Sequence, residues 1–251
     1  MTLMPPSKLR KPRGRFSQCI CVSVYGRTIP EINDSINKAL AFAPGYLELR
    51  LDYLRNIQES LPSLSNLKLR QSDIVTFRAH GEGGRSRVSA KIRERIILQI
   101  ISEMSPPIVD VEINTLSTLP KILDSLRTSS SKNCALIASS HNFHETEKAS
   151  DLRNLILDSS RRYSPSIIKI VRWAKEFNDN LAILSLYNLA EKIKPSRLVA
   201  FCAGPLGIFS RIACVSYGSP FTFASLPNRG TAPGQLDVRS TKVLLDSWEF
   251  D

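Results

Sequence analysis

The sequence predicts a single-domain α/β protein with the fold class of a (β/α)8 TIM barrel, and three observations favour it. Eight short apolar runs alternate with longer segments in which apolar residues recur at helical spacing. The chain has 251 residues, a length at which an α/β barrel commonly forms one domain. Its hydrophobic content of 42% is enough for a large core. An open, doubly wound parallel sheet is the alternative.

The strand candidates are short and rich in Ile, Leu and Val. They are residues 18–24, 46–51, 73–78, 108–113, 134–139, 166–171, 198–202 and 221–224. Helix candidates lie between them, as in 89–104, where Ile92, Ile96, Ile100 and Met104 recur every four residues. The other helix candidates are residues 30–42, 117–127, 146–159, 180–192 and 207–217, with a closing helix that ends at Trp248.

The composition limits the function classes. No run of about 18 apolar residues occurs, and the N-terminus lacks the apolar segment of a secretory signal, so we expect a soluble cytoplasmic protein with no membrane partner. The five cysteines are odd in number and do not have the paired spacing of a zinc site. We therefore expect reduced core cysteines at Cys19, Cys21, Cys134, Cys202 and Cys214.

Residues 1–15 form a basic leader ahead of a predicted barrel domain at 16–251. Five of the eleven net positive charges lie in this leader, which contains three prolines and no acidic residue, so we expect it to be disordered. In the rest of the chain basic and acidic residues are interleaved, without a recognition helix, an aromatic RNA-binding strand or a zinc finger. We do not expect nucleic-acid binding as the main function, although a basic binding protein that is not an enzyme is an alternative.

Strand parity predicts charged side chains inside the barrel. In residues 46–52, Leu47, Leu49 and Leu51 point one way, and Glu48, Arg50 and Asp52 point the other. Helices cover the outside of a barrel, so the charged set faces inward. Residues 108–113 repeat this split with Asp110 and Glu112, and residues 73–78 repeat it with Thr76 and Arg78. Inward charges of both signs indicate a site for a hydrophilic ligand, with internal salt bridges as the alternative.

Lys169 is a cation within an apolar strand candidate, and His141 precedes it by 28 residues, about one strand-plus-helix repeat. If both segments are neighbouring parallel strands, an amine and an imidazole project into the same cavity. Removing an amine from water lowers its pKa and makes it a nucleophile that attacks ketones. A lysine on a solvated edge strand is the alternative.

Several segments, in this order and spacing, resemble the type I 3-dehydroquinate dehydratases from about Gln18 to the C-terminus. The segments are Glu48-Leu-Arg-Leu-Asp52, Thr76-Phe-Arg-Ala-His-Gly-Glu-Gly-Gly84, Ser139-Ser-His-Asn-Phe143, Ile168-Lys-Ile170, Ser210-Arg-Ile212, Tyr217-Gly-Ser219 and Thr231-Ala-Pro-Gly-Gln235. No Gly-Lys-Ser/Thr follows Gly81 to Gly84, so this glycine-rich stretch is not a phosphate loop.

The resemblance implies the conversion of 3-dehydroquinate to 3-dehydroshikimate and water in the shikimate pathway. It assigns the imine-forming amine to Lys169, the general base and acid to His141, and the group that orients His141 to Glu82. Its substrate-binding residues are Glu48, Arg50, Arg78, Arg211 as carboxylate clamp, and Thr231 and Gln235 in a closing loop, with Asp110, Glu112 and Phe223 as further lining residues. This chemistry requires no cofactor or metal. The partner is a small-molecule substrate, and a homodimer is possible.

This chain departs from the family pattern at three places. Thr231 replaces the usual serine, Asn142 replaces the aspartate that commonly follows the histidine, and Phe201 and Ala203 stand where pocket methionines are common. We expect Thr231 to keep the hydroxyl function, Asn142 to lower the pKa of His141, and Phe201 and Ala203 to change the pocket shape. Another Schiff-base barrel, such as a class I aldolase, is an alternative, but it would normally have a phosphate site after strands seven and eight.

Overall fold

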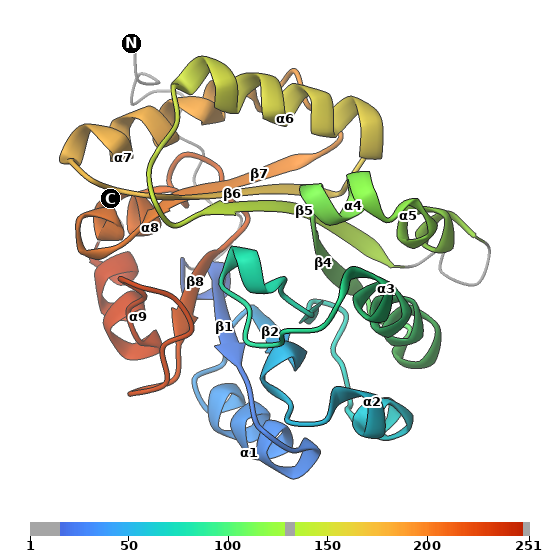
Figure 1. The fold of residues 1–251 in the computed structure, drawn as a ribbon. Helices are drawn as coiled ribbons and strands as arrows, with labels where there is room; N and C mark the ends of the chain where they lie inside the picture. The colour runs from blue at the N-terminus through green and yellow to red at the C-terminus, as the bar shows by residue number, and fades with distance from the viewer. Residues whose placement is uncertain (1–15, 129–133, 248–251) are drawn as a thin grey trace.

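The computed structural model describes residues 16–128 and 134–247. It contains eight parallel strands in one sheet, in the order β7-β6-β5-β4-β3-β2-β1-β8, surrounded by helices (Figure 1). The strands are β1 (Ile20–Val24), β2 (Tyr46–Arg50), β3 (Ile74–Thr76), β4 (Ile108–Glu112), β5 (Ala135–Asn142), β6 (Ile167–Trp173), β7 (Arg197–Ala203) and β8 (Thr222–Ser225). The predicted (β/α)8 architecture is therefore confirmed, with every strand candidate in place.

Two strands extend further than their apolar runs. The expected strand at 134–139 continues through His141 to Asn142, and the strand expected to end at residue 171 continues to Trp173. Backbone pairing with β6 explains the first extension, because His141 pairs with Val171 and Asn142 with Arg172. His141 therefore lies on a rigid strand end rather than in the following loop.

The helices fill the connections between strands. They are α1 (Ile29–Leu40), α2 (Ile57–Ser60), α3 (Ala90–Gln99), α4 (Ile113–Thr118), α5 (Pro120–Arg127), α6 (Ala149–Tyr163), α7 (Phe177–Leu184), α8 (Ile208–Ala213) and α9 (Val238–Asp246). The single helix expected at 117–127 is wrong: α4 and α5 are separate, because Pro120 starts a new helix after Leu119 leaves helical geometry. The last turn of the helix expected at 89–104 is a π-helix, Ile100–Met104. The short α2 has no counterpart among the helix candidates.

The strand order ends at β7 and β8 instead of closing into a continuous ladder. We call the junction between these two strands the seam. Side chains and loops join its two sides: the Phe201 and Phe223 rings lie 6.1 Å apart, and the Gly204 amide donates to the Pro233 carbonyl at 3.1 Å. The backbone is thus held by hydrogen bonds around most of the barrel and by packing at the seam.

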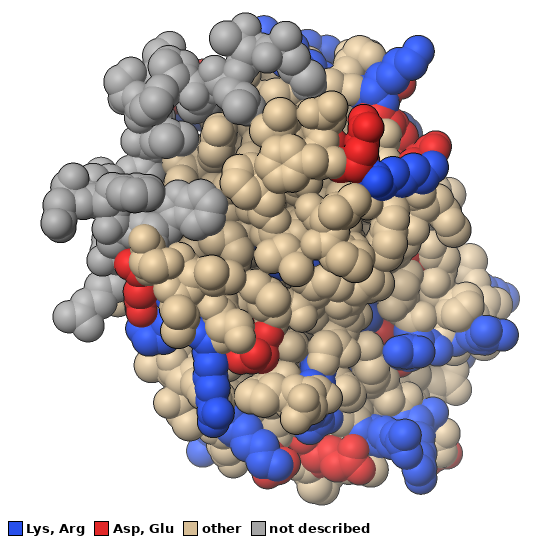
Figure 2. Space-filling view, turned by 90° about the vertical axis from the view of Figure 1, so that its left-hand side faces the viewer, with Lys and Arg blue, Asp and Glu red and all other residues tan. Residues whose placement is uncertain are grey.

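The described surface shows no continuous basic region on the face that carries α7, α8 and α9. Figure 2 shows that Lys and Arg lie beside Asp and Glu around a broad neutral area. Phe177, Leu206 and Phe209 are among the exposed large hydrophobic residues. Within the described residues, no helix is both long and apolar enough for a membrane span. The predicted basic leader, residues 1–15, lies outside the described residues.

Candidate active site

A pocket of about 440 Å³ opens at the carboxyl ends of the strands. All nine residues predicted as catalytic or substrate-binding line it, although they come from six different segments of the chain. The pocket is lined by Ser23, Glu48, Arg50, Arg78, Glu82, Gly83, His141, Phe143, Lys169, Val171, Phe201, Arg211, Phe223, Thr231, Ala232 and Gln235. Its position at the end of a barrel and its charged lining are typical of a site for a small polar molecule.

Lys169 lies in the middle of β6 and is 4% exposed. Its Nζ is 3.0 Å from Asp110 Oδ2 and 3.6 Å from Glu48 Oε1, and 4.0 Å from the centre of the Phe223 ring. The prediction of a buried, inward amine is confirmed. Two carboxylates predicted to face the barrel interior, those of Asp110 and Glu48, lie beside this amine.

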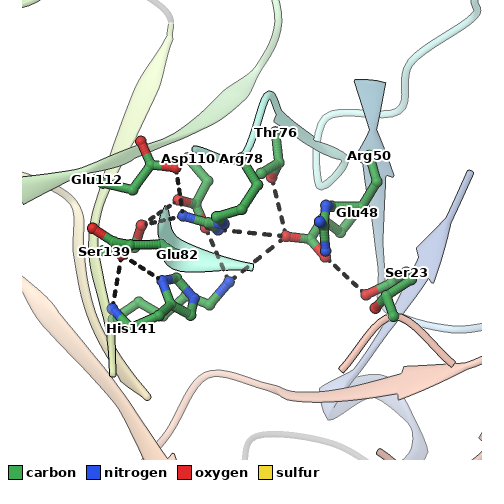
Figure 3. A network of polar contacts seen from close by, with 12 residues as sticks. Ser23, Glu48, Arg50, Thr76, Arg78, Glu82, Asp110, Glu112, Ser139 and His141 are labelled. Carbon is green, nitrogen blue, oxygen red and sulfur yellow. Dashed lines mark hydrogen bonds and ion pairs between the residues drawn. The ribbon is translucent and has the colours of Figure 1, made fainter. Parts of the chain in front are cut away.

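Arg78, directly after β3, connects these carboxylates to a third (Figure 3). Its guanidinium lies 2.7 Å from Asp110, 3.2 Å from Glu112 and 3.9 Å from Glu48. Burial alone would raise the pKa of Asp110, but the cations of Arg78 and Lys169 outweigh it and hold that pKa well below its ordinary value. The floor of the pocket is therefore a buried lattice of paired charges.

His141 and Glu82 form a hydrogen-bonded pair at one wall. Glu82 Oε2 accepts from the His141 backbone amide at 2.8 Å and lies 2.9 Å from Nδ1. With Nδ1–H donating to Glu82, Nε2 keeps its lone pair. Burial, followed by the cations of Arg78 and Lys169, lowers the pKa of His141 well below its ordinary value, so the imidazole is neutral near pH 7. Burial also raises the pKa of Glu82 to about 7.

The glycine-rich turn after β3 allows Glu82 to reach His141. A Cβ at Gly84 would lie 2.0 Å from the Arg78 carbonyl oxygen, and Gly83 has a positive φ of 85°. The same turn places the Gly84 amide against the Ala79 carbonyl at 2.9 Å. The glycines thus shape a tight turn that carries a carboxylate, in agreement with the expectation that this stretch is not a phosphate loop.

Arg211, on α8, is 1% exposed and has a different environment from Arg78. Its Nε and Nη2 are buried without a hydrogen-bond partner among the described residues, and its Cζ lies 4.5 Å from the centre of the Phe201 ring. Burial lowers the pKa of Arg211 to about 10, so it stays charged at neutral pH. A buried cation that lines a pocket without a carboxylate partner is suited to bind an anionic group.

The loop after β8 covers the pocket. Gln235 Oε1 accepts from the Thr231 amide at 2.8 Å and from the Thr231 hydroxyl at 2.9 Å, and Gln235 Nε2 lies 3.5 Å from Ser23 Oγ. Ser23 in turn donates to Glu48 at 2.8 Å. Hydrogen bonds therefore connect the loop to the charged floor, and Thr231 keeps the hydroxyl function expected of it.

Some sequence assignments need correction. Asp110 and Glu112, predicted to line the pocket, lie beneath its surface, and Glu112 pairs with Arg93 on α3 at 2.6 Å. Arg50 lines the pocket but is also paired, through Nε and Nη2, with the carboxylate of Asp52. The inward charges were expected either to contact a ligand or to form internal salt bridges. The cluster contains residues that line the pocket as well as residues in internal salt bridges.

Sequence reasoning did not find Ser23, Phe143, Val171 and Ala232 as lining residues. Strand parity could have found Ser23 and Val171, because each shares a strand face with residues that point inward. The carbonyl group of the Asn142 side chain accepts from the His144 amide at 2.9 Å, so it shapes the turn after β5. His80 and His144 are exposed.

The fold and this pocket define a barrel enzyme that acts on a small polar molecule. The sequence profile of the family described as Type I 3-dehydroquinase matches residues 20–249. A 3-dehydroquinate dehydratase of Methanothermobacter thermautotrophicus is 32% identical over 232 residues, which cover 90% of this chain and 95% of the relative. One from Dehalococcoides mccartyi is 35% identical over 212 residues, which cover 84% and 87%.

Solved structures agree with this match. The crystal structure of a 3-dehydroquinate dehydratase from Geobacillus kaustophilus superposes with a TM-score of 0.78 at 26% identity, covering 93% of each chain. The chain therefore belongs to the type I 3-dehydroquinase family and is a hydro-lyase.

Proposed function

We propose that this protein converts 3-dehydroquinate to 3-dehydroshikimate and water through an imine on Lys169, as a step of the shikimate pathway. The observation that carries the proposal is the convergence of three groups in one pocket: a buried amine, a neutral imidazole and a guanidinium without a carboxylate partner. These are the groups that a reaction on a carboxylated ketone requires for covalent attachment, proton transfer and substrate orientation.

The reaction starts at Lys169. Its amine attacks the C3 carbonyl of the substrate, and the resulting carbinolamine loses water to give an imine. The imine withdraws electrons and acidifies the proton on the adjacent C2 carbon. Asp110 and Glu48, which lie 3.0 Å and 3.6 Å from Nζ, balance the positive charge of the protonated imine.

His141 then moves the proton. Neutral Nε2 removes the C2 proton to give an enamine, and the imidazolium returns a proton to the departing C1 hydroxyl, which leaves as water. Glu82 holds the ring through Nδ1 and stabilises the cation that forms. Hydrolysis of the product imine consumes one water and restores Lys169, so the net reaction releases one water.

Arg211 would bind the substrate carboxylate, because its Nε and Nη2 form one edge of the guanidinium and both lack partners. Glu48, Arg50 and Arg78 would orient the ring hydroxyls and the carboxylate end of the substrate, and Thr231 and Gln235 would close over the ring. A class I aldolase acting on a phosphorylated sugar is a weaker candidate. Such a barrel normally binds phosphate in the region after β7 and β8, and the group that this region offers is a buried guanidinium beside aromatic rings.

A direct assay of the purified protein tests this proposal. We expect 3-dehydroshikimate to form from 3-dehydroquinate, with no measurable turnover in Lys169→Ala. Lys175→Ala is the matched control, because Lys175 is exposed and pairs only with exposed Glu145, so we expect parental turnover. Dehydration that persists in Lys169→Ala would refute the imine mechanism, and a parent protein without dehydratase activity would refute the proposed reaction.

A further inference from the structure

We infer that Phe201 is a positioning residue for the substrate carboxylate: its ring holds the Arg211 guanidinium through a cation–π contact and leaves the Nε–Nη2 edge of that group available to bind the carboxylate. The inference rests on the proposed function, since it concerns the carboxylate of the same substrate. It adds a role for a residue at which this chain departs from the family pattern.

The first observation concerns the groups that contact the two guanidinium groups: an aromatic ring contacts that of Arg211, whereas carboxylates contact that of Arg78. Phe201 lies on β7 and is 2% exposed, and its ring centre is 4.5 Å from the Arg211 Cζ. A desolvated guanidinium over an aromatic face gains a substantial cation–π attraction. Phe201 therefore stabilises the charge of Arg211 without using any of its N–H donors.

The second observation is that the Phe201 ring is itself held in place across the seam. Its centre lies 6.1 Å from the Phe223 ring on β8, and that ring lies 4.0 Å from Lys169 Nζ. Two aromatic rings thus separate the two cations that would act at opposite ends of the substrate. A flexible aliphatic side chain at position 201 would offer the guanidinium no aromatic face and would hold it less firmly.

The third observation is the edge that remains. Nε and Nη2 of Arg211 form one edge of the guanidinium and have no hydrogen-bond partner among the described residues, and the Phe201 ring contacts the group without accepting a hydrogen bond from either. Arg50 shows what this edge binds, because its Nε and Nη2 hold the two oxygens of Asp52 at 2.8 Å and 2.9 Å. The same edge of Arg211 is therefore suited to bind a carboxylate through two parallel hydrogen bonds.

The experiment compares Phe201→Leu with the parent and with Phe221→Leu. Phe221 is 0% exposed and also contacts Phe223, and among the described residues the ring with a cation–π contact to Arg211 is that of Phe201, so Phe221 controls for loss of a core ring. We expect Phe201→Leu to raise KM for 3-dehydroquinate about tenfold, with kcat changed less than threefold. For an analogue in which a carboxamide replaces the carboxylate, we expect parent and Phe201→Leu to bind alike.

A second set of variants covers the case in which Phe201→Leu fails to fold. Fluorinated phenylalanines at position 201 keep the ring shape and weaken its negative face stepwise, so KM should rise with each added fluorine, whereas the same replacements at 221 should leave KM unchanged. A flat KM series at 201 would overturn the inference, as would equal KM effects on the acid and its carboxamide. If the parent does not dehydrate 3-dehydroquinate, the proposed function fails, whereas activity with a flat series refutes only the role of Phe201.

Discussion

The two sides of the barrel interior bury their cations in different ways. On the side formed by β2 to β6, Arg78 and Lys169 lie within 2.7–3.9 Å of the carboxylates of Asp110, Glu48 and Glu112. At the seam between β7 and β8, Arg211 has no carboxylate partner among the described residues and lies against Phe201. Both kinds of cation are almost fully buried, with Arg78 3% and Arg211 1% exposed.

This difference separates two tasks. Paired charges satisfy one another, so they can hold Lys169 and its neighbours in fixed positions whether or not a ligand is present. A buried cation without a counter-ion is not stabilised by a neighbouring negative charge, so an anionic ligand that pairs with it gains binding free energy. We call the side formed by β2 to β6 the paired side. It is thus suited to chemistry, and the seam is suited to recognition.

The largest expected effect comes from removing the proton-transfer group at the paired side. His141→Ala should lower kcat by roughly 10²- to 10⁴-fold, because the general base and acid is lost, while imine formation on Lys169 continues. Steady-state kinetics and single-turnover mass measurements check the two parts. His144→Ala, an exposed neighbour, is the control and should keep parental kcat. Loss of the imine together with turnover would show that His141 also acts in the attachment step.

The next prediction tests the difference between the paired side and the seam by means of the free energy of unfolding. Arg78→Leu leaves Asp110 without its nearest cation and Glu112 with Arg93 alone, and should cost about 3–5 kcal/mol of stability. Arg211→Leu removes a buried charge that has no carboxylate partner, so it should leave stability unchanged or raised while weakening substrate binding at least tenfold. Denaturant titrations and binding isotherms measure both. Equal destabilisation by the two variants would contradict the division between paired side and seam.

The pH dependence of stability gives a smaller effect, and its direction follows from the pKa of Glu82. Burial raises the pKa of Glu82 to about 7, above its unfolded value of 4.5, so the folded state binds this proton more tightly. The contribution is fully present below pH 4.5 and is lost as pH rises towards 7. Relative to Glu82→Gln, the parent should therefore lose about 2–3 kcal/mol of stability across this window.

Denaturant titrations of both proteins at several pH values measure that difference, and the absence of any pH-dependent difference would exclude a raised pKa. The pH dependence of catalysis has the opposite direction, because activity falls as the pH is lowered. The pKa of His141 is lowered, so the neutral base should persist below pH 6.5, and kcat/KM should fall only under more acidic conditions.

The smallest effect should come from the basic leader, residues 1–15, which lies outside the described residues. Deleting residues 1–11 should leave kcat and Tm nearly unchanged, because the site residues begin at Ser23. Binding to polyanions at low salt should weaken, since three of the five leader cations are removed. A large loss of turnover would show that the leader takes part in the fold or in a dimer contact, and gel filtration would distinguish the two.

Sequence patterns predicted the barrel, and strand parity predicted the inward Glu48, Arg50 and Arg78, because parity depends only on local alternation. The resemblance to the family, and not local alternation, pointed to Glu82, Arg211, Thr231 and Gln235. Parity also predicted inward Asp110 and Glu48 but not their contact with Lys169, since they arrive from strands 59 and 121 residues away in the chain. The seam was also missed. Alternation along β7 and β8 does not show whether two strands exchange hydrogen bonds, which depends on how the whole barrel closes.

The central claim is that the buried amine of Lys169 is the nucleophile, and trapping the covalent intermediate tests it most directly. The protein is incubated with 3-dehydroquinate and borohydride, and intact mass and peptide mapping follow. The account predicts one stable adduct per chain, located on Lys169, that is absent from Lys169→Ala and present in His141→Ala. An adduct on any other lysine, or turnover without a trappable adduct, would contradict it.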